Sequence, residues 1–178
     1  MIHILTGPVH SGKTTLLQRV TAQLISQNIA VYGFLSLSIK QNKKFIGYDL
    51  YDLKRETQTP FIRKEGEEHW QRIGAHFFIP ETLDHAQNII CHAGDADICI
   101  VDEVGPLELE GKGLWPALKK VINLPSPDYV LVVRETILDF WLGTLGGVQI
   151  KIFEISDQEL FPKMVQYLST KDSHSKKN

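Results

Sequence analysis

A glycine-rich loop near the amino end limits the folds open to this chain. Residues 7–14, Gly-Pro-Val-His-Ser-Gly-Lys-Thr, match every fixed position of the pattern G-x-x-x-x-G-K-[ST]. An apolar segment at residues 2–5 precedes the loop, and apolar residues recur with helical spacing over residues 16–25. A strand, such a loop and a helix in this order place backbone N–H groups and the positive end of a helix around an anion. The pattern therefore predicts an α/β protein that holds phosphate groups at this loop.

Individual residues of the loop have separate predicted tasks. Gly7 and Gly12 lack a Cβ, so the backbone can adopt the angles and close approaches that turn successive N–H groups toward an anion. Lys13 would bring a full positive charge to the β- and γ-phosphates of a nucleotide, and the hydroxyl of Thr14 would bind Mg²⁺. His10 is interpreted as a variable position without a catalytic task.

An acidic pair follows the second buried strand that the sequence predicts. Asp102 and Glu103 come after the continuously apolar residues 98–101, a pattern typical of a strand covered on both faces. Open α/β sheets bind ligands in the crevice at the carboxyl ends of their strands. Asp102 is therefore predicted to bind Mg²⁺, which prefers oxygen ligands, and Glu103 to orient and deprotonate an attacking water. The alternative for such a pair taken alone is a solvated turn.

Positive side chains outside the loop have more than one interpretation. Arg134 ends the apolar segment 129–133 at what should be the same edge of the sheet. There its guanidinium would stabilise charge on the γ-phosphate, and the alternative is a surface arginine. Lysines and arginines also gather between residues 40 and 64. A solvated face is the favoured interpretation of that segment, with a phosphate-facing lid or a partner surface as alternatives.

The order of the remaining elements favours a mostly parallel sheet with helices on both faces. Alternation of apolar and polar residues on either side of residues 41–44 predicts an antiparallel β-hairpin inserted in this core or forming its edge. The polar segment 54–68, with Pro60 and Gly66, is predicted to be an exposed loop. Strands are further expected at 74–78 and 148–153, and helices at 80–93, 115–122, 137–142 and 157–168.

Length and composition bound the organisation of the chain and exclude several classes. A chain of 178 residues is sized for one domain, predicted over residues 1–169, and residues 170–178 have no apolar side chain and are predicted to be a disordered tail. The net charge of −2 disfavours a general nucleic-acid binder. No apolar run approaches the roughly 20 residues of a membrane span and no signal segment is recognised, so we expect no membrane association and a cytoplasmic location. Cys91 and Cys99 are too far apart for a CxxC pair.

Longer strings of residues carry a family resemblance. Residues 7–15 read GPVHSGKTT and residues 101–109 read VDEVGPLEL. With Gly33-Phe34, IGYD at 46–49 and RIG at 72–74, they run in order over nearly the whole chain and resemble the THEP1-type nucleoside-triphosphatase family. The resemblance implies a RecA-like P-loop fold and slow, Mg²⁺-dependent hydrolysis of ATP, GTP and other nucleoside triphosphates.

The same resemblance implies a set of site residues. The nucleotide would be held by Gly7, Pro8, Val9, His10, Ser11, Gly12, Lys13, Thr14 and Thr15, the metal by Thr14 and Asp102, and the water by Glu103. Glu108 falls on an acidic position of the second string without an assigned role. The chain departs from the family at Val9-His10, where a Pro-Gly pair is usual, and in the hairpin at Ser38, Lys40, Lys44 and Phe45.

Hydrolysis of nucleoside triphosphates is the leading functional hypothesis, with Lys13, Glu103 and Arg134 as catalytic residues. A small-molecule or nucleotide kinase is an alternative, because the same cradle serves phosphoryl transfer. A nucleotide-dependent adapter, whose bound triphosphate controls binding of a protein partner, is another. Little of the chain remains for a separate substrate domain, and this favours water as the acceptor.

Overall fold

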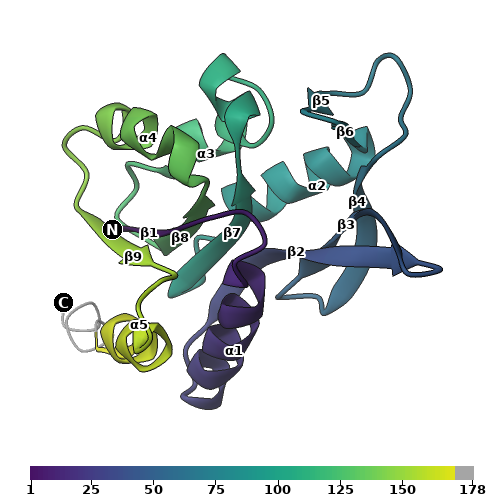
Figure 1. Cartoon of the computed structure of the whole chain (residues 1–178). Helices are drawn as coiled ribbons and strands as arrows, with labels where there is room; N and C mark the ends of the chain where they lie inside the picture. The colour runs from purple at the N-terminus through teal and green to yellow at the C-terminus, as the bar shows by residue number, and fades with distance from the viewer. Residues whose placement is uncertain (171–178) are drawn as a thin grey trace.

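The computed structural model describes residues 1–170, and within them nine strands form one sheet (Figure 1). The strand order is β5-β6-β4-β3-β2-β7-β8-β1-β9. In chain order the strands and helices are β1 (Ile2–Thr6), α1 (Lys13–Ser26), β2 (Val31–Gln41), β3 (Lys44–Asp52), β4 (Thr57–Arg63), β5 (Arg72–Ile73), β6 (His76–Phe78), α2 (Pro80–Cys91), β7 (Ile98–Val104), α3 (Trp115–Val121), β8 (Asp128–Val133), α4 (Leu138–Thr144), β9 (Ile150–Glu154) and α5 (Leu160–Ser169). Short 3-10 helices, η1 (Pro106–Glu110) and η2 (Glu135–Ile137), follow β7 and β8.

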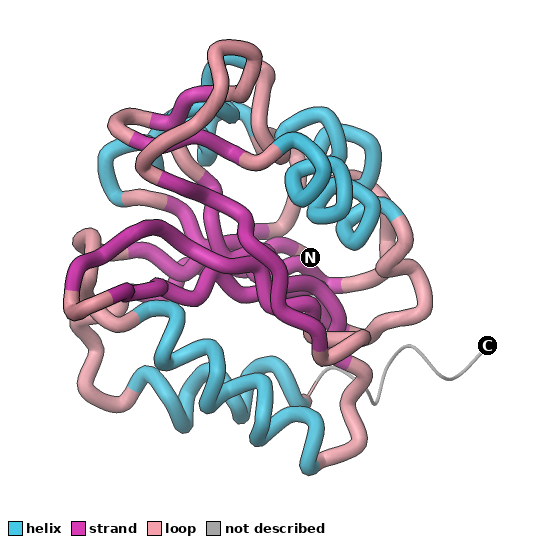
Figure 2. Tube along the Cα trace, turned by 90° about the vertical axis from the view of Figure 1, so that its right-hand side faces the viewer, coloured by secondary structure: helices cyan, strands magenta, loops and turns pink. Residues whose placement is uncertain are grey.

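Helices cover both faces of the sheet (Figure 2). On one face, α1 and α5 bury Leu17 and Met164 in an apolar cluster with residues of the central strands. On the other face, α2, α3 and α4 bury Leu118 and Trp141 in a second cluster. Each such side chain contributes about 1.5–3 kcal/mol by leaving water. The strands between the two layers are therefore apolar on both sides, and the predicted α/β sheet flanked by helices is confirmed.

The parallel half of the sheet brings distant motifs to one edge. Neighbouring strands run parallel from β2 through β7, β8 and β1 to β9. The chain leaves the carboxyl end of β1 into the glycine-rich loop, and Asp102 and Glu103 occupy the carboxyl end of β7. Because β8 separates β1 from β7, Arg134 emerges between the loop and the acidic pair.

The antiparallel half is larger than the predicted hairpin. β2 pairs in parallel with β7 over its first residues and then continues as the partner of β3, which confirms the hairpin. The predicted exposed loop at 54–68 is wrong, because Thr57–Arg63 forms β4 against β3. Phe61 and Ile62 are fully buried there. Pro60 lies at a register shift opposite Asp49, where a strand tolerates a residue without an N–H, so its presence did not exclude a strand.

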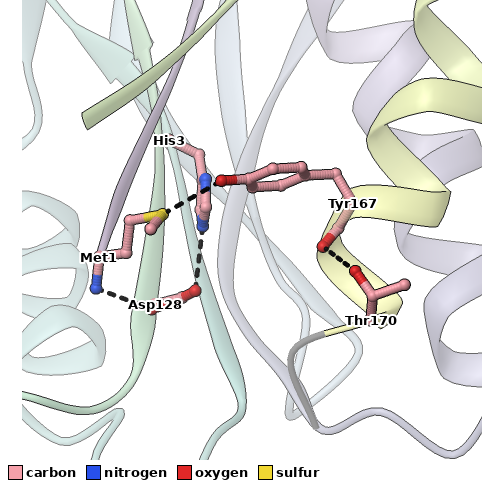
Figure 3. A network of polar contacts seen from close by, with 5 residues as sticks. All are labelled: Met1, His3, Asp128, Tyr167 and Thr170. Atoms are coloured by element: carbon pink, nitrogen blue, oxygen red, sulfur yellow. Dashed lines mark hydrogen bonds and ion pairs between the residues drawn. The ribbon is translucent and has the colours of Figure 1, made fainter. Parts of the chain in front are cut away.

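A polar network ties the amino end of β1 to β8 and α5, at the edge opposite the loop (Figure 3). The amino group of Met1 donates to Asp128 Oδ1 at 2.7 Å, and His3 Nε2 lies 3.0 Å from Asp128 Oδ2. The hydroxyl of Tyr167 donates to the sulfur of Met1 at 3.6 Å. Burial would raise the pKa of Asp128, but the hydrogen bonds from His3 and the amino group hold that pKa below its usual range.

The carboxyl end of α5 is the last part that the structure describes. The N–H of Thr170 donates to the carbonyl of Gln166 at 3.2 Å. The rest of the predicted tail 170–178 lies outside the described residues. Within residues 1–170, no helix has the length and apolar character to cross a membrane.

Candidate active site

A cavity of about 590 Å³ opens at the carboxyl edge of the parallel strands. Its walls come from the glycine-rich loop and α1, from the ends of β7 and β8, and from the antiparallel strands β2, β3 and β4. The polar residues of its lining include Lys13, Thr14, Thr15, Ser36, Tyr48, Gln58, Asp102, Glu103 and Arg134. The predicted loop, acidic pair and Arg134 thus share one cavity.

The loop has the backbone conformation of an anion cradle. Gly12 precedes α1 with φ +92°, a value that favours glycine, and its carbonyl accepts the Leu16 N–H at 2.9 Å. Residues 9–15 line the cavity, whereas Gly7 and Pro8 are not part of its lining. A Cβ on Gly7 would fall 2.3 Å from Ile155 Cγ2, so a glycine is needed for this packing.

Lys13 reaches back across the loop that precedes it. Its Nζ donates to the carbonyls of Gly7 at 2.9 Å and Pro8 at 2.6 Å. Burial lowers the pKa of Lys13, and the carboxylates of Asp102 and Glu103 act in the opposite direction. The ammonium is therefore held over the loop, where an entering phosphate would meet it.

Asp102 is a buried carboxylate beside the Thr14 hydroxyl. It is 3% exposed, its Oδ2 accepts the Ser36 N–H at 3.1 Å, and it hydrogen-bonds to the side chain of Thr14. Burial raises its pKa to about 7 despite these two hydrogen bonds. Two oxygen donors, one of them an incompletely compensated buried acid, suit a hard divalent cation that keeps several waters.

Glu103 and Arg134, which both line the cavity, form an ion pair. Arg134 Nη2 donates to Glu103 Oε1 at 2.8 Å. The Glu103 side chain is 17% exposed and that of Arg134 is 39% exposed, so both are accessible to a bound ligand. One carboxylate oxygen of Glu103 is engaged by the arginine, and the structure brings this predicted pair into direct contact.

The wall formed by β2, β3 and β4 was missed by sequence reasoning. Ser36 is one of the polar residues in the alternating pattern that predicted the hairpin, yet it is buried, and its hydroxyl donates to the carbonyl of Asp102. Tyr48 and Gln58 also line the cavity. Burial, with a further contribution from Glu103, raises the pKa of Tyr48. The IGYD string marked Tyr48 as part of a resemblance but carried no sign of this position.

The basic segment does not reach the cavity. None of its lysines and arginines, which are Lys40, Lys43, Lys44, Lys54, Arg55, Arg63 and Lys64, is among the residues that line it. Arg63 pairs with Asp49 at 2.6 Å on the antiparallel sheet, and the Lys54 ammonium lies over the Tyr32 ring. The interpretation of this segment as a phosphate-facing lid has no support in this conformation.

Glu108 stabilises the turn that follows β7. It is 2% exposed, and its carboxylate accepts the N–H groups of Gly105 at 2.7 Å and Leu114 at 2.8 Å. Burial raises its pKa to about 7, against the effect of these hydrogen bonds. Glu108 therefore stabilises the conformation of the segment after Glu103, which contains η1.

Replacing Glu108 with glutamine should reduce the pH dependence of stability. The pKa of Glu108 is about 7 in the folded protein, above its ordinary value of 4.5. The contribution of Glu108 to the free energy of unfolding is therefore fully present below about pH 4.5 and is lost as the pH rises through 7. This loss is at most about 3 kcal/mol. Denaturant unfolding from about pH 5 to about pH 8 should show a steeper fall in the wild type than in Glu108→Gln, apart from a constant offset for the lost acceptor. Equal slopes would contradict the assignment.

Comparisons with known proteins point to one family. The model of a family described as NTPase matches residues 2–161. Nucleoside-triphosphatase THEP1 of Hyperthermus butylicus is 28% identical over 166 residues, which cover 91% of this chain and 87% of that protein. The cancer-related nucleoside-triphosphatase homolog of Bos taurus is 30% identical over 132 residues, covering 68% of this chain and 69% of that protein.

A solved structure shows the same fold. The solution structure of a human cancer-related nucleoside triphosphatase matches with a TM-score of 0.73 at 21% identity, covering 97% of this chain and 98% of that chain. The family model spans nearly the whole chain, from β1 into α5. The protein therefore belongs to the NTPase family and groups with the THEP1-type nucleoside-triphosphatases.

Proposed function

We propose that this protein hydrolyses nucleoside triphosphates, ATP and GTP among them, to the diphosphate and phosphate with Mg²⁺. One observation carries the proposal. A single cavity joins a phosphate-binding loop to three charged side chains from neighbouring strands, Asp102, Glu103 and Arg134. The printed names of the relatives, which are nucleoside-triphosphatases, support the same activity.

Binding of the triphosphate would depend mainly on the loop. Backbone N–H groups of residues 9–15 and the amino end of α1 offer partial positive charge to the phosphate oxygens. Lys13 adds a full charge. Its present partners are the carbonyls of Gly7 and Pro8 and the hydroxyl of Ser11, which β- and γ-phosphate oxygens would join or replace. Because most of this recognition uses the backbone, it favours the triphosphate group and not a particular base.

Mg²⁺ would be held by the hydroxyl of Thr14 and, through its own oxygen or a bound water, by the carboxylate of Asp102. The buried acid fits this group because a nearby cation would offset the burial that now raises its pKa to about 7. Bound there, Mg²⁺ would neutralise charge on the β- and γ-phosphate oxygens. The Ser36 N–H would continue to orient the Asp102 carboxylate from the opposite strand.

Glu103 would act as the general base and Arg134 as the stabilising cation. The water oxygen attacks the γ-phosphorus, its proton passes to the Glu103 carboxylate, and the bond from the γ-phosphorus to the β–γ bridging oxygen breaks. Arg134 holds Glu103 Oε1, and this leaves the second oxygen to receive the proton. The same guanidinium, which lines the cavity, would stabilise charge on the γ-phosphate oxygens.

The test is a phosphate-release panel on the purified protein. ATP, GTP, CTP and UTP are each supplied with Mg²⁺, with excess EDTA, and with Mg²⁺ plus a nucleoside monophosphate as a candidate acceptor. We expect release from more than one triphosphate, loss of most of the rate in EDTA, and no dependence on the acceptor. A rate that requires the acceptor, with transfer of the γ-phosphate to it, would replace hydrolysis by a kinase reaction.

A further inference from the structure

The corner between α1 and α5 exposes a planar cation next to the phosphate loop. Arg19 lies one helical turn after Thr15, which lines the cavity, and is itself exposed. Its guanidinium carbon is 4.4 Å from the centroid of the Phe161 ring, in the first turn of α5. One face of the guanidinium is thus covered by the ring, while the side chain as a whole stays open to solvent.

The sheet order sets the direction in which a bound triphosphate extends. β1 lies between β8 and β9. The groups proposed to act at the γ-phosphate, Glu103 and Arg134, come from β7 and from the end of β8, on one side of β1. In the proposed reaction the γ-phosphate would therefore point to the β8 side of the loop, and the nucleoside would leave the loop on the β9 side.

The β9 side of the loop is where Arg19 and Phe161 stand. Ile155 follows β9, its N–H donates to the Thr6 carbonyl at 3.0 Å, and its side chain packs where a Cβ on Gly7 would be. From Ile155 the chain turns into α5, which lies beside α1 (Figure 1). This corner, which lies beside the loop and outside the lining of the cavity, thus presents a half-buried aliphatic side chain, a half-buried aromatic ring and a guanidinium.

We propose that Arg19, seated on Phe161, is the platform on which the base of the nucleotide stacks, with Ile155 at its side. This inference rests on the proposed function for the direction of the phosphates. A guanidinium is planar and stacks on flat π-systems, which a lysine ammonium does not. Stacking accepts every base because each has a π-face, so the platform binds purine and pyrimidine nucleotides alike.

The test measures binding without turnover. Affinities for ADP, CDP and pyrophosphate, each with Mg²⁺, are determined by calorimetry for the wild type, Arg19→Ala, Arg19→Lys and Phe161→Leu. We expect Arg19→Ala and Arg19→Lys to weaken ADP and CDP by about tenfold, Phe161→Leu to weaken them by less, and none of the three to change pyrophosphate binding. Gln23→Ala, an exposed change one turn further along α1, is the matched control and should bind all three ligands as the wild type does.

Three results would overturn the platform. Unchanged ADP affinity in Arg19→Ala would show that the base does not touch this side chain. An equal loss for pyrophosphate would place Arg19 on the phosphates, and a full rescue by lysine would show that charge and not stacking is used. Melting temperatures check that each variant is folded. Because no hydrolysis is measured, a failure of the proposed reaction in the phosphate-release panel would be seen separately from a failure of this platform.

Discussion

Replacing Lys13 with alanine is expected to lower the rate of phosphate release by at least about 10²–10³-fold. The change removes the one full positive charge that the loop offers to the β- and γ-phosphates, where negative charge shifts as the bond to the γ-phosphorus breaks. It also removes the hydrogen bonds from Nζ to the Gly7 and Pro8 carbonyls. Both effects act on the loop, so nucleotide affinity should fall together with the rate.

The measurement is steady-state phosphate release from ATP and GTP, with melting temperature as a check on folding. Lys119→Ala removes an exposed lysine from α3 and is the matched control, expected to keep the wild-type rate. If Lys13→Ala retained a rate close to that of the wild type, the loop would not be the catalytic phosphate site and the proposed function would fail.

Replacing Glu103 with glutamine should lower the maximal rate by about 10²–10⁴-fold while leaving nucleotide affinity within a few-fold of the wild type. Glutamine keeps the shape of the side chain and an oxygen that can accept from Arg134, but it cannot take a proton from water. Single-turnover hydrolysis and equilibrium binding of ATP separate the two quantities. The control is Glu135→Gln, which removes the same charge from an exposed neighbour of Arg134 that does not line the cavity.

The contact between Glu103 and Arg134 also predicts how the two substitutions combine. Arg134→Ala should also slow hydrolysis, and the double variant should be less impaired than the product of the two single effects, because both changes disrupt one unit. A Glu103→Gln protein that hydrolyses ATP at the wild-type rate would remove the general-base role. A strictly multiplicative double variant would show that the two residues act independently.

Much of the site followed from local sequence. The loop pattern predicted the conformation around Gly12 and the start of α1, because few residue types adopt such angles or bind phosphate at that spacing. The apolar run before Asp102 and the one before Arg134 predicted buried parallel strands that end at one edge. These patterns involve residues that are close together in the sequence, so backbone preferences and the spacing of apolar residues are enough to predict them.

The antiparallel wall could not be predicted in the same way. Whether Ser36 is wet or buried depends on the strands that lie on either side of β2, one of which is distant in sequence. The segment around Pro60 looked like a loop because only two of its residues, Phe61 and Ile62, signal burial, and both are buried through a bulge that needs β3 beside it. Pairing between separated segments, and not local preference, makes these residues part of the fold.

The sequence by itself determined that this chain has a phosphate-binding loop, an acidic pair and an α/β core, because each of these features depends on residues that lie close together along the chain. Only the tertiary structure decided how these parts act together. It inserted β8 between β1 and β7, placed Arg134 against Glu103, buried Asp102 against Ser36, and set Arg19 on Phe161. The physical reason is that such contacts depend on strand order and helix packing, which are properties of the whole folded chain.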